Sequence, residues 1–143
     1  MMNVVRAYVD TSVLLWGFNF PEGNSSKIIG LLSLGKIEGY ASELTLAEIE
    51  NYFDLNYGEI TKRKAITDIS ANLKIVLISE INSERDKWVG KIKEKDLDHL
   101  ATAKFLKLKY LIAVDRDFEP FSEYRTPKQF LKEFGYKYAL TDY

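Results

Sequence analysis

Cysteine is absent from the 143 residues of the chain, and histidine occurs once, at His99. Without cysteine the chain can form no disulfide, no zinc site with thiolate ligands and no thiol nucleophile. A single histidine argues against a histidine-rich metal site and against catalysis by a Ser-His or Cys-His pair. Any bound metal would therefore be a hard cation that carboxylates hold.

Long apolar runs and an excess of either charge are also missing. No stretch approaches the roughly 18 apolar residues of a membrane span. The first ten residues, MMNVVRAYVD, enter a strand pattern at once instead of forming a signal peptide. We therefore expect a cytoplasmic protein without a membrane segment. The net charge of −1 gives no global indication of nucleic-acid binding.

Short apolar runs alternate with longer helical patterns along the chain. Strands are predicted over 4–10, 38–42, 74–79 and 110–115, and helices over 25–37, 44–58, 59–73, 82–95, 96–108 and 126–134, with a further helical turn after residue 10. This order is typical of a three-layer α/β/α protein with a central, mainly parallel sheet of four to five strands. The length and the 46% apolar content fit a single domain over 1–143.

Acidic residues occur where the predicted strands end or where the following helices begin. They are Asp10, Glu48, Asp96, Asp98, Asp115 and Asp117. Ligands of such folds bind outside the carboxyl ends of the strands, so these acids could face one crevice. Clustered carboxylates raise one another's pKa, and a divalent cation such as Mg²⁺ or Mn²⁺ relieves that repulsion. Two such ions can activate a water and stabilise the leaving oxygen of a phosphodiester.

Each acid also has a purely structural explanation. Asp10 and Asp96 could be helix N-caps, and Glu48 could complete a capping box with Thr45. The acids of segment 115–117 could be ordinary turn residues. Taken singly, the residues leave these alternatives open, and only their joint placement favours a site.

Asp96 and Asp98 pose a separate choice because they lie two positions apart. On a helix that spacing separates two side chains by about 200°, so both cannot point into the crevice. Composition alone does not decide which of them faces it.

Five segments in order resemble the PIN domain family, especially the VapC-type toxin ribonucleases, over nearly the whole chain. The family's opening strand and first acid resemble YVDTSVLL with Asp10, and its metal-site glutamate segment resembles ASELTLAEIENYF with Glu48. Its later helix start is similar to DLDHLATA with Asp96, and the strand with its last acid is similar to LIAVDRDF with Asp115. The closing strand and helix resemble RTPKQFLKEF. One departure is Val114, which stands where the family commonly has asparagine.

The resemblance implies a Mg²⁺- or Mn²⁺-dependent endoribonuclease. Its catalytic and metal-holding residues would be Asp10, Glu48, Asp96 and Asp115, with Asp117 assisting as a further metal ligand. The fixed offset of the helix motif selects Asp96 for the site. Asp98 then becomes a first-turn helix acid, and His99 a packing or supporting residue.

Two further residues are candidates for contact with the substrate. Arg116 adjoins Asp115 and is the best placed basic residue for a phosphate. Ser12, like Thr11, could hydrogen-bond a carboxylate or the phosphate, or could simply start a helix.

The resemblance also implies partners: an RNA substrate, a small antitoxin protein and a second copy of the chain in a homodimer. The chain would then be the toxin of a type II toxin-antitoxin pair. The alternatives are a stand-alone RNA-processing nuclease and a non-catalytic domain that binds RNA or protein. Five aromatic residues could line an antitoxin groove or belong to the core: Trp16, Phe18, Tyr52, Phe53 and Tyr57. The tail GYKYALTDY could be a strand, an oligomer contact or disordered.

Overall fold

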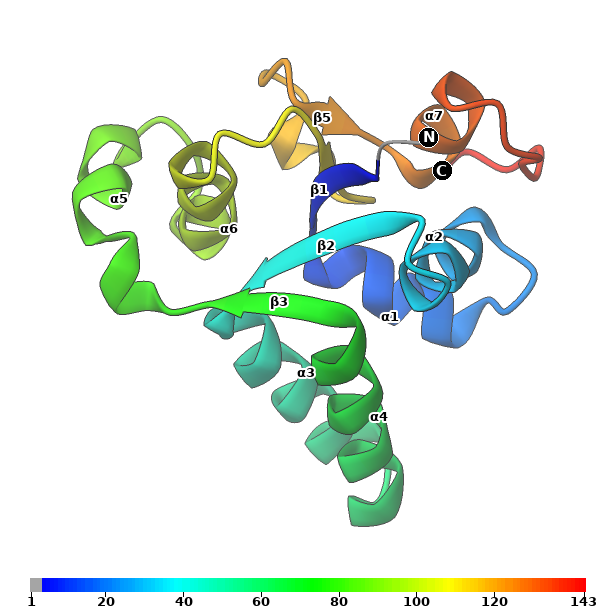
Figure 1. Cartoon of the computed structure of the whole chain (residues 1–143). Helices are drawn as coiled ribbons and strands as arrows, with labels where there is room; N and C mark the ends of the chain where they lie inside the picture. Colours follow the sequence, from blue (N-terminus) through cyan, green and yellow to red (C-terminus); the bar gives the residue numbers. More distant parts are fainter. Residues whose placement is uncertain (1–3) are drawn as a thin grey trace.

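A five-stranded sheet forms the centre of the protein, whose computed structural model describes residues 4–143 (Figure 1). All strand pairs are parallel and the order is β3-β2-β1-β4-β5. The strands are β1 (Val5–Val9), β2 (Ile37–Ser42), β3 (Leu73–Val76), β4 (Leu111–Ile112) and β5 (Tyr124–Arg125). The predicted α/β architecture with a parallel sheet is confirmed, and β5 is the fifth strand that the run of apolar segments did not reveal.

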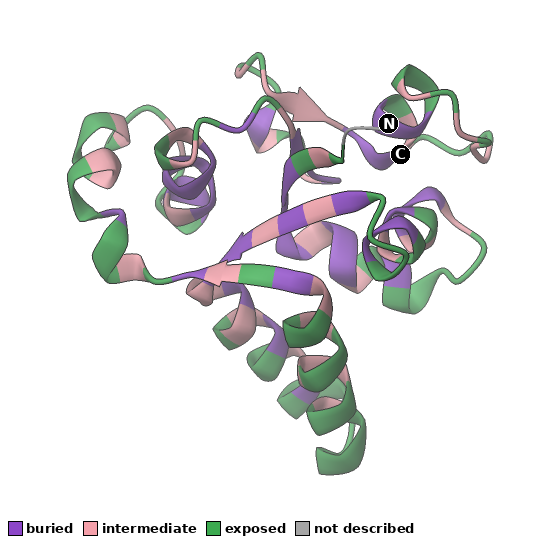
Figure 2. Ribbon diagram, in the orientation of Figure 1, coloured by how far each residue is buried: buried purple, intermediate pink, exposed green. Residues whose placement is uncertain are grey.

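Helices connect the strands in the alternating order expected for parallel pairing. They are α1 (Thr11–Asn19), α2 (Asn24–Ser33), α3 (Glu43–Asn56), α4 (Glu59–Asn72), α5 (Asn82–Trp88), α6 (Glu94–Phe105) and α7 (Pro127–Glu133), with short 3₁₀ turns η1 (Ile78–Glu80) and η2 (Arg116–Phe118). The α3–α4 hairpin projects beyond the sheet, and its α4 surface is largely exposed (Figures 1 and 2). No helix within 4–143 is long and apolar enough to cross a membrane.

The two larger of three hydrophobic clusters cover opposite faces of the sheet, as the alternation of β1 shows. Ala7 and Val9 belong to a cluster built with α1, α2, α3 and α7, whereas Tyr8 belongs to a second cluster with Leu100 and Ala103 of α6. Successive strand side chains point to opposite faces, so Tyr8 is directed away from its two neighbours. This alternation brings a phenol from the central strand under the helix that carries Asp96.

Several predicted boundaries are wrong, and two of them, the starts of α6 and α3, concern the candidate site. Helix α6 begins at Glu94, with Lys93 as its N-cap, so Asp96 lies inside the first turn and Asp98 lies beyond it. Helix α3 is capped by Ser42, which accepts from the Leu44 N–H. The predicted capping box of Glu48 is therefore absent, because Thr45 is already inside the helix. The positive φ of Gly90, +81°, follows the end of α5 and separates it from α6.

The tail, residues 135–143, is packed against the first two helices. The Asn24 side chain is buried at the start of α2. Its amide nitrogen donates to the Ala139 carbonyl at 3.1 Å and to the Tyr143 carbonyl at 2.7 Å, while its oxygen accepts from the Ala139 N–H at 2.7 Å. The Tyr143 ring meets Trp16 edge to face. The tail is thus an ordered segment without strand pairing.

Candidate functional site

Three aspartates form a carboxylate cluster at the carboxyl ends of the sheet's strands. Asp96 comes from the first turn of α6, and Asp115 and Asp117 come from the turn after β4. One oxygen of each lies within 4.8 Å of the others, and no other group of three metal-ligating side chains meets that spacing within 4–143. The Asp115 carboxylate caps η2 by accepting from the Asp117 N–H at 2.9 Å, which fixes these two acids relative to each other. An all-oxygen donor set of this kind suits Mg²⁺ or Mn²⁺.

The ammonium of Lys95 lies among these three carboxylates. Its Nζ is 3.0 Å from both oxygens of Asp96, 2.9 Å from Asp115 Oδ2 and 3.0 Å from Asp117 Oδ2. Burial lowers the pKa of Lys95, but its bonds to Asp115, Asp96 and Asp117 outweigh burial and raise the pKa well above the ordinary value. Lys93 contacts only the other oxygen of Asp117, at 3.2 Å.

The carboxylates of the cluster differ in how readily they hold a proton. Burial raises the pKa of Asp96 to about 6, and the neighbouring acids Asp117 and Asp115 add to the rise against the opposing effect of Lys95. Hydrogen bonds from Lys95, then from Asp96, hold the pKa of Asp117 below its usual range. Asp96 therefore takes up a proton more readily than Asp117 does.

A second group of residues, here called the buried network, consists of Ser42, Tyr8, His99 and Glu48, which hydrogen bonds join in that order. The Ser42 N–H donates to the Tyr8 hydroxyl oxygen at 3.0 Å, and that hydroxyl lies 2.5 Å from His99 Nδ1. The other ring nitrogen of His99, Nε2, is 2.8 Å from Glu48 Oε1. Glu48 is ionised and its carboxylate can only accept, so Nε2–H donates to Glu48, whereas the direction of the Tyr8–His99 bond is set by whether Nδ1 carries a proton.

Charge stabilises the polar ends of this network. Burial lowers the pKa of His99, but the Asp10 charge and the bond to Glu48 outweigh it, so that pKa is raised overall. Burial raises the pKa of Glu48, but His99 and the Thr11 hydroxyl outweigh it and leave the pKa below the ordinary value. Thr11 donates to Glu48 at 2.7 Å and lies 3.2 Å from the buried Thr45 hydroxyl. Glu48 is therefore held ionised and in one orientation.

Asp10 caps α1 and is tied to the strand that precedes the last acids. Its Oδ2 accepts from the Ser12 N–H at 3.1 Å and from the Ser12 hydroxyl at 2.6 Å. The Ser12 oxygen in turn accepts from the Val114 N–H at 3.0 Å. Val114 thus bonds a side chain instead of a strand carbonyl, and β4 ends at Ile112, earlier than predicted.

The structure divides the predicted site residues into two adjoining groups. Asp96 and Asp115 join Asp117 in the carboxylate cluster, while Asp10 and Glu48 lie at the buried network. His99 links them, with Nδ1 3.7 Å from Asp10 Oδ1. The two groups adjoin on α6, where Asp96 of the cluster and His99 of the network lie one turn apart. Their roles as metal ligands stay predictions.

The substrate candidates and Asp98 have defined positions. Ser12 and Thr11 both bond carboxylates, and a contact of Ser12 with substrate stays a prediction. Arg116 is exposed on η2, with its guanidinium 5.8 Å from the centre of the Tyr143 ring. Asp98 points away from the cluster and pairs with Arg85 of α5 at 2.7 Å, as the 200° separation requires. The prediction of a first-turn acid is wrong for Asp98, because α6 begins at Glu94 and its first-turn acids are Glu94 and Asp96.

Sequence reasoning missed two residues of this region. Lys95 is not among the predicted site residues, and its position directly before Asp96 is the signal that could have found it. Tyr8 is also absent from the predicted site residues, although its hydroxyl bonds His99, and the alternation of side chains along β1 is the signal that sets it apart from Ala7 and Val9.

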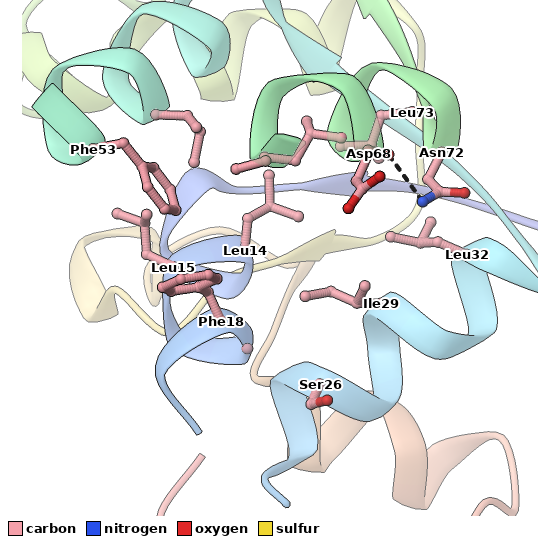
Figure 3. A pocket seen from close by; sticks show the side chains of 14 residues that line it. Leu14, Leu15, Phe18, Ser26, Ile29, Leu32, Phe53, Asp68, Asn72 and Leu73 are labelled. Atoms are coloured by element: carbon pink, nitrogen blue, oxygen red, sulfur yellow. Dashed lines mark hydrogen bonds between the residues drawn. The ribbon is translucent and has the colours of Figure 1, made fainter. Parts of the chain in front are cut away.

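An apolar pocket of about 230 Å³ lies apart from the acids, between the α1–α2 and α3–α4 pairs (Figure 3). Leu14, Phe18, Ile29 and Phe53 are among the side chains that line it. The five aromatic residues considered for an antitoxin groove do not form one surface, because they lie on different sides of α1. Phe18, Tyr52, Phe53 and Tyr57 form one aromatic cluster, whereas Trp16 packs on Phe20 and Tyr143 instead.

Comparison with known proteins shows which solved structures share this fold. No curated protein matched the chain. A toxin-antitoxin complex from Klebsiella pneumoniae is similar with a TM-score of 0.64 and 25% identity, over 85% of this chain and 97% of that chain. VapBC-1 from nontypeable Haemophilus influenzae has a TM-score of 0.68 at 16% identity, over 86% and 98%. VapC20 from Mycobacterium tuberculosis, described as a sarcin-ricin loop cleaving toxin, has a TM-score of 0.59 at 14% identity, over 80% and 93%.

A family model extends the comparison to the sequence. The model of the PIN domain matches residues 7–124, which include both groups of acids. The resemblance seen in the ordered motifs is thereby confirmed, and the chain belongs to the PIN domain family.

Proposed function

We propose that the protein is a divalent-metal-dependent endoribonuclease acting in the cytoplasm. The observation that carries the proposal is the carboxylate cluster of Asp96, Asp115 and Asp117 beside an ionised, fixed Glu48. Membership of the PIN domain family and the likeness to VapC20 support RNA as the substrate.

The chain's residues suit hydrolysis of a phosphodiester in separate ways. Asp96, Asp115 and Asp117 would hold Mg²⁺ or Mn²⁺, which when bound supplies positive charge at the phosphate and activates water. Asp10 and Glu48 present fixed carboxylate oxygens at the same edge, where they can accept a proton or hold a second cation. Exposed Arg116, one position after Asp115, offers a phosphate contact at the rim.

Cleavage assays with paired variants test the proposal. With a panel of single-stranded and structured RNAs, we expect Asp96→Asn to lower the cleavage rate by about a hundredfold or more, since it removes a metal ligand. Asp98→Asn is the matched control, two positions away but paired with Arg85, and should keep the rate within about threefold of the starting protein. EDTA should abolish cleavage and Mn²⁺ restore it. Full activity of Asp96→Asn, or cleavage that EDTA does not affect, would rule the mechanism out.

We further propose that the protein is the toxin of a toxin-antitoxin pair, because the similar structure from Klebsiella pneumoniae is described as a toxin-antitoxin complex. The apolar pocket lined by Leu14, Phe18 and Phe53 is the surface that an apolar antitoxin segment would fill. Co-expression with the product of an adjoining small reading frame tests this, and Phe18→Asp should lose the complex while Trp16→Asp, on the other side of α1, should keep it. Failure to find such a partner would favour a stand-alone RNA-processing nuclease. A full set of folded variants without cleavage would instead favour a non-catalytic domain.

The proposed homodimer is tested by light scattering during gel filtration. A mass of twice the 16.5 kDa chain would support it.

A further inference from the structure

Lys95 occupies the position that a cation bound by the carboxylate cluster would need. Its Nζ lies within 3.0 Å of four oxygens, two from Asp96 and one each from Asp115 and Asp117. A Mg²⁺ ion requires oxygens at about 2.0–2.1 Å, and it uses the same lone pairs. An ammonium at this place and a divalent ion on these oxygens would therefore be like charges a few ångströms apart.

We propose that Lys95 is a built-in counter-ion of the cluster, and that a divalent metal binds by displacing its ammonium. The inference rests on the proposed metal site but goes beyond it. It assigns to this lysine the control of how tightly that site takes up metal.

The exchange requires that the Lys95 side chain can leave while the carboxylates stay in place. The Lys95 side chain is 58% exposed, whereas that of Asp96 is 6% exposed and is held in the first turn of α6. A lysine ammonium on a four-carbon stem can leave without moving the backbone, and ion pairs this exposed are individually weak. The acids thus stay in place when the cation changes.

Lys93 is a natural control within the same segment. It lies two positions before Lys95 and carries the same charge, but it contacts only Asp117 Oδ1, at 3.2 Å, outside the set of oxygens that Lys95 bridges. A general effect of nearby positive charge would change metal affinity for both lysines. Displacement from the cluster would change it for Lys95 alone.

The experiment measures Mn²⁺ binding to the full chain by electron paramagnetic resonance of the free ion, without RNA. We expect Lys95→Met to bind Mn²⁺ on the order of tenfold more tightly than the starting protein, which is about 1.4 kcal/mol. Lys93→Met should stay within about threefold, and Lys95→Arg, which keeps the charge, should bind as weakly as the starting protein.

Thermal unfolding adds a readout that does not depend on the affinity measurement. In EDTA, Lys95→Met should unfold at a lower temperature than Lys93→Met, because three carboxylates have lost their shared cation. Added Mn²⁺ should raise the unfolding temperature of Lys95→Met more than that of the starting protein.

The outcomes separate the two proposals. Equal Mn²⁺ affinity in the starting protein and Lys95→Met, both folded by circular dichroism, would overturn the role of Lys95 and leave the metal site standing. Absence of Mn²⁺ binding in every folded variant would overturn the metal site and the exchange together.

Discussion

The carboxylate cluster and the buried network adjoin at one edge of the sheet but are built in opposite ways. In the cluster, the buried Asp96 and the partly exposed Asp115 and Asp117 share one exposed lysine. In the network, Tyr8 and His99 are fully buried, and each bond ends on a defined partner. Because unsatisfied buried polar groups cost more free energy than exposed ion pairs gain, the network is fixed by folding and the cluster is free to exchange its cation.

Removal of His99 should have the largest effect on this contrast. His99→Ala leaves the Tyr8 hydroxyl and Glu48 without their shared partner and creates a cavity, so the free energy of unfolding should fall by about 2–4 kcal/mol. RNA cleavage should fall by about 10- to 100-fold, since Glu48 loses its orientation. Urea unfolding and cleavage rates measure both, and Mn²⁺ affinity of the folded variant should stay within about threefold. Loss of Mn²⁺ binding would show that the two groups are not separable.

Asp115→Asn should lower metal affinity strongly and stability little, which is the reverse of His99→Ala. Mn²⁺ affinity should fall about tenfold or more, because one of three ligands loses its charge. The free energy of unfolding should change by less than about 1 kcal/mol, since asparagine can still cap η2. Asp86→Asn, at an exposed acid of α5, is the control that should leave both quantities unchanged. A large loss of stability in Asp115→Asn alone would contradict the division.

Tyr8→Phe tests the buried network more gently. The ring stays, but His99 Nδ1 and the Ser42 N–H lose their partner. The free energy of unfolding should therefore fall by about 1–2 kcal/mol. Tyr52→Phe removes a surface hydroxyl that bonds Asn19 and should cost less than about 0.5 kcal/mol. Equal effects of the two variants in urea unfolding would count against a special role for the Tyr8 hydroxyl.

Ser12→Ala should give the smallest change and should affect both groups. The Val114 N–H loses its acceptor and Asp10 loses a donor, so the free energy of unfolding should fall by about 0.5–1.5 kcal/mol. Mn²⁺ affinity should fall by no more than about threefold. An effect larger than that of Tyr8→Phe would make Ser12, and not the Tyr8–His99 pair, the main support of this edge.

Local periodicity predicted the parts of the site that depend on one segment. The end of the first strand placed Asp10, and the 200° rule separated Asp96 from Asp98. It could not predict the Asp98–Arg85 pair, because Arg85 comes from another helix whose approach depends on the turn at Gly90. The helix start was misplaced because nothing at Lys93 is a strong cap signal, as its side chain makes no capping bond.

Long-range partners account for the remaining differences. The two-residue strand β5 has no pattern of its own and exists because it pairs with β4. The interaction of Lys95 with three acids depends on the turn after β4, which a sequence places only coarsely. The parallel pairing of the strands and the edge at which the acids lie followed from the alternation of elements, whereas the spatial order of the strands and the bonding within the site did not.

The bonds of Asn24 bear on how this chain can be shortened. The matched family region ends at residue 124, yet Phe130 and Leu131 of α7 are buried in the same cluster as Ile28 of α2, and Asn24 ties residues 139–143 to that helix. A fragment cut at the family boundary would expose this apolar surface and leave a buried amide without its acceptors. The part of the chain that folds together therefore extends beyond residue 124, and a working fragment for crystals or binding assays has to keep its last residues.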